Sequence, residues 1–174
     1  MTWQLTETPI RALAAYIQSG TVSADKLANI EARAEYADWP ATLADFVAIR
    51  HHEPPDNPEA AYPVLYMRPI RTRLKVGPGG LRRGFIGQHD YMVAIICASM
   101  DGPDMALAMA ERYMLAVVEM IAEYFSRADS RTIEWAMGND PEILYEPLYT
   151  SQAGEFFSDA RMLISAQVSE GAIA

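Results

Sequence analysis

The residue types that most often bind metals are few in this sequence. Histidine occurs only as His51, His52 and His89. His51 and His52 are adjacent in a proline-rich segment, and neighbouring side chains of an extended chain point in opposite directions. Metal ligands must converge on one ion. The pattern therefore favours a solvated loop over a metal site.

The single cysteine, Cys97, is the only candidate thiol nucleophile, and it lies in the apolar run MVAIICASM. A lone thiol cannot form an intramolecular disulfide, and cysteine in a buried strand behaves as a small hydrophobic residue. A catalytic thiol needs a neighbouring base and some exposure to solvent. We therefore predict a structural role for Cys97.

Other segments have a partial likeness to functional motifs. Asp101 and Asp104 lack the additional spaced ligands of an EF-hand loop, and capping of the following helix explains them more simply. GPGGLRRG leads into a predicted strand, whereas a phosphate-binding loop leads into a helix. No Gly-x-Ser-x-Gly elbow occurs, and Glu119 and Glu123 lie on the predicted solvated side of a helix. The sequence therefore predicts neither an enzyme nor a cofactor or metal.

Hydrophobic periodicity indicates which elements would position a site. Three segments have helical spacing: residues 9–19, residues 24–37 capped by Ser23, and a long helix from the DGPD segment to about Phe125. Five segments have the character of strands: residues 63–76, 89–100, 131–137, 143–149 and 159–168. The sequence Gly138-Asn-Asp-Pro141 is typical of a turn between the third and fourth of these strands.

This order of elements predicts an α+β fold, with an antiparallel sheet of about four to five strands, helices packed on one face and a long hairpin arm. We expect residues 1–174 to form a single domain. Its parts are N-terminal helices in residues 1–40, a proline-rich surface loop in residues 41–62, and the sheet with the long helix in residues 63–174.

Composition limits the functional classes. The chain has 174 residues, of which 51% are hydrophobic, and a formal net charge of −9. An acidic balance argues against a general nucleic-acid-binding protein, which normally has a basic surface. No stretch of eighteen consecutive apolar residues is present, and the N-terminal segment lacks the features of a signal peptide. We therefore expect no membrane span and a mature chain that begins at or near Met1.

The charge is divided unevenly along the chain. Residues 68–88 contain no acidic residue but six cations: Arg68, Arg71, Arg73, Lys75, Arg82 and Arg83. Alternation along the strand predicts that Arg71, Arg73 and Lys75 share one face, and Pro69 indicates a sheet edge or a bulge. Two interpretations are open. The segment is either an ordinary exposed strand with a flexible loop, or an arm that contacts acidic surface on a neighbouring subunit.

The order of these elements and their local sequences resemble those of the tail terminator and neck (head-to-tail joining) proteins of tailed bacteriophages and related gene-transfer particles. The resemblance covers nearly the whole chain. It lies in five segments: the helix TPIRALAAYI, the extended YPVLYMRPIRTRLKV with its glycine-rich hairpin, the strand HDYMVAIICASM, the helix DMALAMAERYMLAVVEMIAEY, and paired C-terminal strands.

This resemblance implies a structural subunit, without enzymatic activity or cofactor, that is assembled in the host cytoplasm into the virion. It implies a homohexameric ring that caps the tail tube protein and meets the head connector or stopper protein, with DNA passing through the lumen without specific binding. Stopper and adaptor positions in the neck stay open, as does a different class, a small-molecule-binding domain or enzyme on an α+β sandwich.

Overall fold

The computed structural model describes residues 7–38, 43–46, 48–50, 62–76, 85–127, 133–136, 142–150 and 154–170. The helices are α1 (Glu7–Ile17), α2 (Val22–Glu31), a 3-10 turn (Ala34–Tyr36) and α3 (Pro103–Arg127). The strands are β1 (Ala48–Arg50), β2 (Val64–Val76), β3 (Phe85–Ser99), β4 (Ile133–Ala136), β5 (Ile143–Thr150) and β6 (Phe156–Glu170).

The strands form one six-stranded sheet in the order β1-β2-β3-β6-β4, with β5 also paired to β6. All pairs are antiparallel except β1 with β2. β4 and β5 do not form the hairpin that the turn signal indicated. Both pair with the same edge of β6, β4 with residues 165–168 and β5 with residues 156–162. The predicted turn at residues 138–141 lies outside the described residues.

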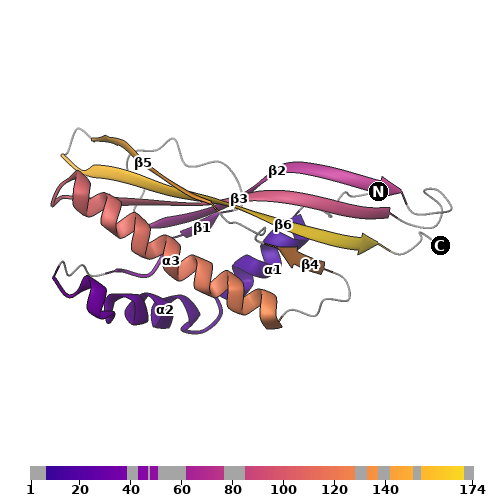
Figure 1. The fold of residues 1–174 in the computed structure, drawn as a ribbon, viewed down its shortest axis with the longest axis horizontal. Helices are drawn as coiled ribbons and strands as arrows, with labels where there is room; N and C mark the ends of the chain where they lie inside the picture. The colour runs from indigo at the N-terminus through magenta and orange to yellow at the C-terminus, as the bar shows by residue number, and fades with distance from the viewer. Residues whose placement is uncertain are drawn as a thin grey trace.

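The helices cover one face of the sheet, as Figure 1 shows. α3 crosses this face and α2 lies on the far side of α3. The main core lies between α3 and the sheet and includes Leu65, Tyr91, Ile95, Met114 and Met162. The predicted α+β class, with helices on one face of an antiparallel sheet, is confirmed. The alternation expected in the last strand is also observed, because Met162, Ile164 and Ala166 are all buried.

Part of the segment expected to be a proline-rich surface loop belongs to the fold instead. β1 adds a short parallel strand to β2, with Ile49 paired to Leu65. The ring of Phe46 lies 5.6 Å from the ring of Tyr113, whose hydroxyl donates a 2.9 Å hydrogen bond to the carbonyl of Ala44. The loop prediction was wrong here because the prolines begin only at Pro54, beyond this strand.

The second helix is shorter than its periodicity indicated. Thr21 occupies the N-cap position, whereas the predicted cap, Ser23, is buried inside the helix. The hydroxyl of Thr21 donates to the carboxylate of Asp25 at 2.5 Å rather than to a backbone amide. The α-helix ends at Glu31, before the 3-10 turn. Gly20, at φ +58°, lies in the left-handed region where glycine is favoured after a helix, as expected at the end of α1.

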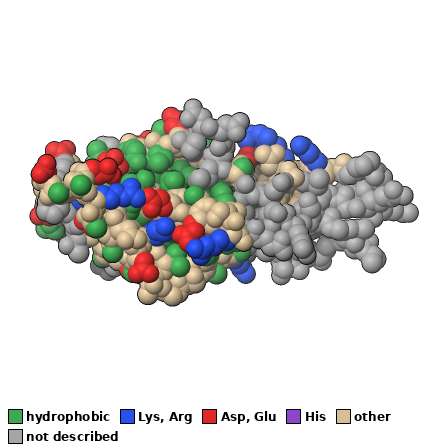
Figure 2. Space-filling view, turned by 60° about the horizontal axis from the view of Figure 1, so that its bottom comes forward, with side chains coloured by type: hydrophobic (Ala, Val, Ile, Leu, Met, Phe, Trp, Pro, Cys, Tyr) green, Lys and Arg blue, Asp and Glu red, His purple; other side chains and the backbone are tan. Residues whose placement is uncertain are grey.

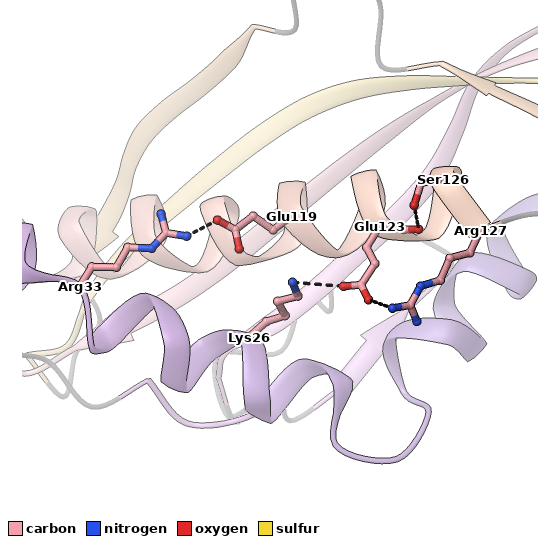
Figure 3. Close-up of polar contacts among 6 residues, drawn as sticks. All are labelled: Lys26, Arg33, Glu119, Glu123, Ser126 and Arg127. Carbon is pink, nitrogen blue, oxygen red and sulfur yellow. Dashed lines mark hydrogen bonds and ion pairs between the residues drawn. The ribbon is translucent and has the colours of Figure 1, made fainter.

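The carboxylates that were expected to be solvated on α3 form ion pairs with α2 instead, as Figure 3 shows. Glu123 pairs with Lys26 at 3.1 Å and with Arg127, and Glu119 pairs with Arg33, just beyond the end of α2. Side chains of both signs therefore lie beside one another on the helical side, which faces the viewer in Figure 2. The prediction failed because helical periodicity does not reveal that a second helix covers this side of α3.

Candidate assembly surface

The ends of β2, β3 and β6 extend beyond the helical layer and form an arm (Figure 1). β2 pairs with β3 as far as Val76 and Phe85, and β3 pairs with β6 as far as Glu170. The burial of β2 changes abruptly along its length. Residues 64–67 are buried against the body, whereas residues 69–76 are exposed. β1 pairs only with Val64–Tyr66, and no other described strand pairs with that edge of β2, so the arm presents a sheet edge.

A bulge in β2 places four cations on one face of this arm. The register with β3 shifts between Pro69 and Arg71, as the proline indicated. Regular alternation would put Arg68 on the face opposite Arg71, because the two are three residues apart. With the shift, the cations lie opposite alternate residues of β3 and share one face. These pairs are Arg68 with Met92, Arg71 with Asp90, Arg73 with Gln88, and Lys75 with Ile86. We call Arg68, Arg71, Arg73 and Lys75 the basic row.

Asp90 anchors the middle of the basic row. Its carboxylate accepts a 2.8 Å hydrogen bond from Nε of Arg71 and a 2.7 Å bond from the hydroxyl of Ser165. Arg71, Asp90 and Ser165 are directly opposite one another on β2, β3 and β6, so this network joins the three strands of the arm. Burial alone raises the pKa of Asp90, but the bonds from Ser165 and Arg71 and the nearby Arg73 charge outweigh it and lower the pKa.

Asp90→Asn is expected to lower the free energy of unfolding at pH 7 by about 1 kcal/mol, because Arg71 is half exposed and its ion pair is screened by solvent. The folded-state pKa of Asp90 lies below its usual value of 3.8. The stabilisation is therefore fully present above pH 3.8 and is lost as the pH falls through the folded-state pKa. Urea titrations of both proteins from pH 7 to pH 2 measure this, and a difference that grows toward low pH would contradict it.

Apolar side chains lie beside the basic row and are unusually exposed. Ile70 at the bulge is 52% exposed and Leu163 on β6 is 59% exposed. With Arg71, Asp90 and Ser165 these two side chains line a groove of about 420 Å³. Leu74 and Val76 are also exposed, but they alternate with Arg73 and Lys75 and therefore lie on the opposite face of the arm. A surface that mixes exposed apolar side chains with arginine is typical of protein contact sites.

The structure thus brings together four of the six cations that the sequence singled out. The other two, Arg82 and Arg83, lie outside the described residues, as do His51 and His52. Sequence reasoning missed Asp90, Ser165 and Leu163. Leu163 had a usable signal, because an outward-facing leucine interrupts the pattern set by the inward Met162, Ile164 and Ala166.

His89 is the buried histidine of the arm. His89 is fully buried and lies 3.0 Å from the hydroxyl of Thr72, and burial lowers its pKa against the opposing charge of Asp90. No group of three or more metal-binding side chains is found in the part of the chain that the structure describes. No helix among the described residues is long and apolar enough to cross a membrane.

Cys97 is buried, as predicted, and its thiol donates a 3.2 Å hydrogen bond to the carbonyl of Ala106. Burial, with a contribution from the charge of Asp159, raises the pKa of Cys97 to about 12. Since the thiolate is the reactive form, we expect no reaction with a thiol reagent at pH 8 in the folded protein and rapid reaction after denaturation. Ellman titration with and without denaturant measures both rates, and comparable rates would contradict the prediction.

Comparison with solved structures found a protein chain with a similar fold. The chain matches a protein chain of a structure described as the virion of a native gene transfer agent particle, with a TM-score of 0.50 and 13% sequence identity. The match covers 97% of this chain and 100% of the other. The two chains therefore share a fold over their full lengths. No protein-family model and no curated protein matches the sequence.

Proposed function

We propose that this protein is a structural subunit of a phage-like virion. The observation that carries the proposal is the full-length likeness of its fold to a chain of a gene transfer agent virion. In this proposal residues 1–174 form one domain, which has no catalytic activity and no cofactor.

Within the particle we propose the neck position of a tail terminator. Copies of the chain form a hexameric ring that caps the tail tube protein and joins it to the head connector or stopper protein. The basic row, together with Arg82 and Arg83, contributes to contacts between subunits. The acidic balance of the chain, −9 overall, suits a ring that DNA passes through, since like charge repels phosphate.

The mass of the purified protein, measured by native mass spectrometry, tests the ring directly. We expect a closed oligomer with six copies. Electron microscopy of virions labelled with an antibody to this protein tests its position in the particle. We expect the label at the junction of head and tail. A protein that is monomeric in solution and absent from particles would overturn the proposal. Label elsewhere in the particle would keep the virion role and exclude the neck position.

A further inference from the structure

The outer edge of β2 is open along the arm. Every residue from Pro69 to Val76 is exposed, and no described strand pairs with this edge beyond Tyr66. β2 is the outermost strand of the arm in Figure 1. In an edge strand, the backbone N–H and C=O groups of alternate residues point outward and lack partners. Residues 71–76, beyond the bulge, therefore offer such groups over about 20 Å, the length of an ordinary strand.

The two faces of this edge strand differ in chemistry. Arg73 and Lys75 point to the face of the sheet that the helices leave uncovered. Leu74 and Val76 alternate with them and point to the opposite face, where they are 45% and 53% exposed. A strand that added to this edge would therefore meet cations on one face and apolar side chains on the other.

Strand pairing inside the arm leaves these side chains without complementary neighbours. Side chains opposite one another on paired strands stabilise a sheet through opposite charge or apolar contact. Arg71 has such a neighbour in Asp90, with which it forms an ion pair. The next three pairs lack this complementarity: Arg73 with Gln88, Leu74 with Gly87, and Lys75 with Ile86. A complementary neighbour for these three residues would have to lie on the open side of β2.

Charged side chains on an edge strand can also serve to prevent association. Two arms that met edge to edge would place arginine and lysine beside arginine and lysine, so the cations disfavour a second arm as the partner. The exposed apolar side chains of Leu74 and Val76 do not suit an edge whose only role is protection. A strand with acidic side chains on one face and apolar side chains on the other satisfies both faces of the edge.

We infer that the β2 edge of the arm binds an extended segment of a partner protein by strand addition, and that acidic and apolar residues alternate in this segment. Backbone hydrogen bonds supply the affinity and the alternating side chains supply the specificity. Acidic side chains of the segment lie beside Arg73 and Lys75, and an apolar side chain lies beside Leu74 on the other face. The inference concerns the arm alone and does not depend on the ring or on a place in the neck.

Fluorescently labelled synthetic peptides, titrated with the full-length protein and followed by anisotropy, test this binding. The probe alternates glutamate and valine. One control peptide has lysine in place of glutamate, and a second has the composition of the probe with all glutamates before the valines. We expect the probe to bind, the grouped peptide to bind at least about tenfold more weakly, and the lysine peptide not to bind. Equal binding of all three peptides would overturn the inference, as would no binding of the probe.

Backbone methylation separates strand addition from a contact through side chains alone. A methyl group on a backbone nitrogen removes a hydrogen-bond donor, and in an extended peptide the N–H groups of alternate residues point to opposite edges. Two further probes are methylated at every glutamate or at every valine. Only one edge of the peptide pairs with β2, so we expect one of these probes to lose binding and the other to keep it. Equal binding of the two methylated probes would overturn strand addition.

Variants of the protein locate the binding site. Arg73→Glu with Lys75→Glu is expected to weaken binding of the probe at least about tenfold and to gain binding of the lysine peptide. Gln18→Glu with Asn29→Glu adds acidic side chains away from the arm and is expected to bind the probe like the wild type. All four side chains are exposed, so both proteins are expected to fold, which circular dichroism verifies. An arm variant that binds the probe like the wild type would exclude this edge.

Hydrogen exchange measured by mass spectrometry reports on the edge itself. We expect the probe to slow amide exchange in the peptic fragment that contains residues 71–76, and to leave fragments of α2 unchanged. Exchange in residues 71–76 that does not respond to a saturating amount of bound probe would overturn the inference. Such a failure leaves the proposed virion role untouched, because that role rests on the likeness of the fold.

Discussion

Glu31→Ala is expected to lower the free energy of unfolding by about 3 kcal/mol, because it leaves a buried guanidinium without its carboxylate. The Arg112 side chain is only 3% exposed, and its Nη1 lies 3.2 Å from Oε1 of Glu31. The guanidinium also lies 4.3 Å from the ring centre of Tyr36. This pair joins α2 to α3, so its loss weakens the attachment of α2. Urea denaturation followed by circular dichroism measures the change.

Two control variants test whether the loss of stability in Glu31→Ala comes from the buried charge of Arg112. Glu35→Ala removes a carboxylate whose side chain is 61% exposed, and it is expected to change the stability by less than about 0.5 kcal/mol. Glu31→Leu with Arg112→Met removes both charges and is expected to restore much of the loss, since apolar replacements of a buried pair are often well tolerated. If the double replacement is as unstable as Glu31→Ala, the cost does not come from an unpaired charge.

Leu65→Ala is expected to lower the free energy of unfolding by about 3 kcal/mol, the usual cost of a cavity in a well-packed core. Leu65 is fully buried and belongs to the main core between the sheet and α3. It lies on β2 in the part that the helices cover. Chemical denaturation of the two proteins measures the difference, and m-values that agree would show that the same surface is exposed on unfolding.

The same replacement further along β2 provides a matched control. Leu74 is 45% exposed, so Leu74→Ala is expected to change the stability of the monomer by less than about 0.5 kcal/mol. An effect of Leu74→Ala on folding as large as that of Leu65→Ala would mean that the arm is packed against the body and does not stand beyond it.

The sequence by itself determined the class of fold, the positions of its main strands and helices, and the distribution of charge along the chain. The alternation of apolar and polar residues located β2 and β6, a nearly continuous apolar run located β3, and helical spacing located α1 and α3, because these patterns arise within each element. The same local information showed that Cys97 is buried. The uneven charge of residues 68–88 was also readable, because it needs only the order of residues.

The tertiary structure decided which elements meet. β4 and β5 both pair with β6 because the register is set by hydrogen bonds between strands distant in sequence, and a local turn signal does not reveal the partner. β1 was missed because a three-residue parallel strand has no periodicity of its own. The pairing of Glu119 and Glu123 with α2 likewise depends on how two helices pack.

The candidate assembly surface shows most clearly which features the local sequence determines and which depend on tertiary contacts. Arg71, Arg73 and Lys75 shared a face in the sequence pattern, but Arg68 joined them only through the register shift after Pro69. Asp90 and Leu163 came to the same surface from β3 and β6 through cross-strand pairing. Residue types and periodicity are local properties, whereas a surface is assembled by contacts between segments far apart in the chain.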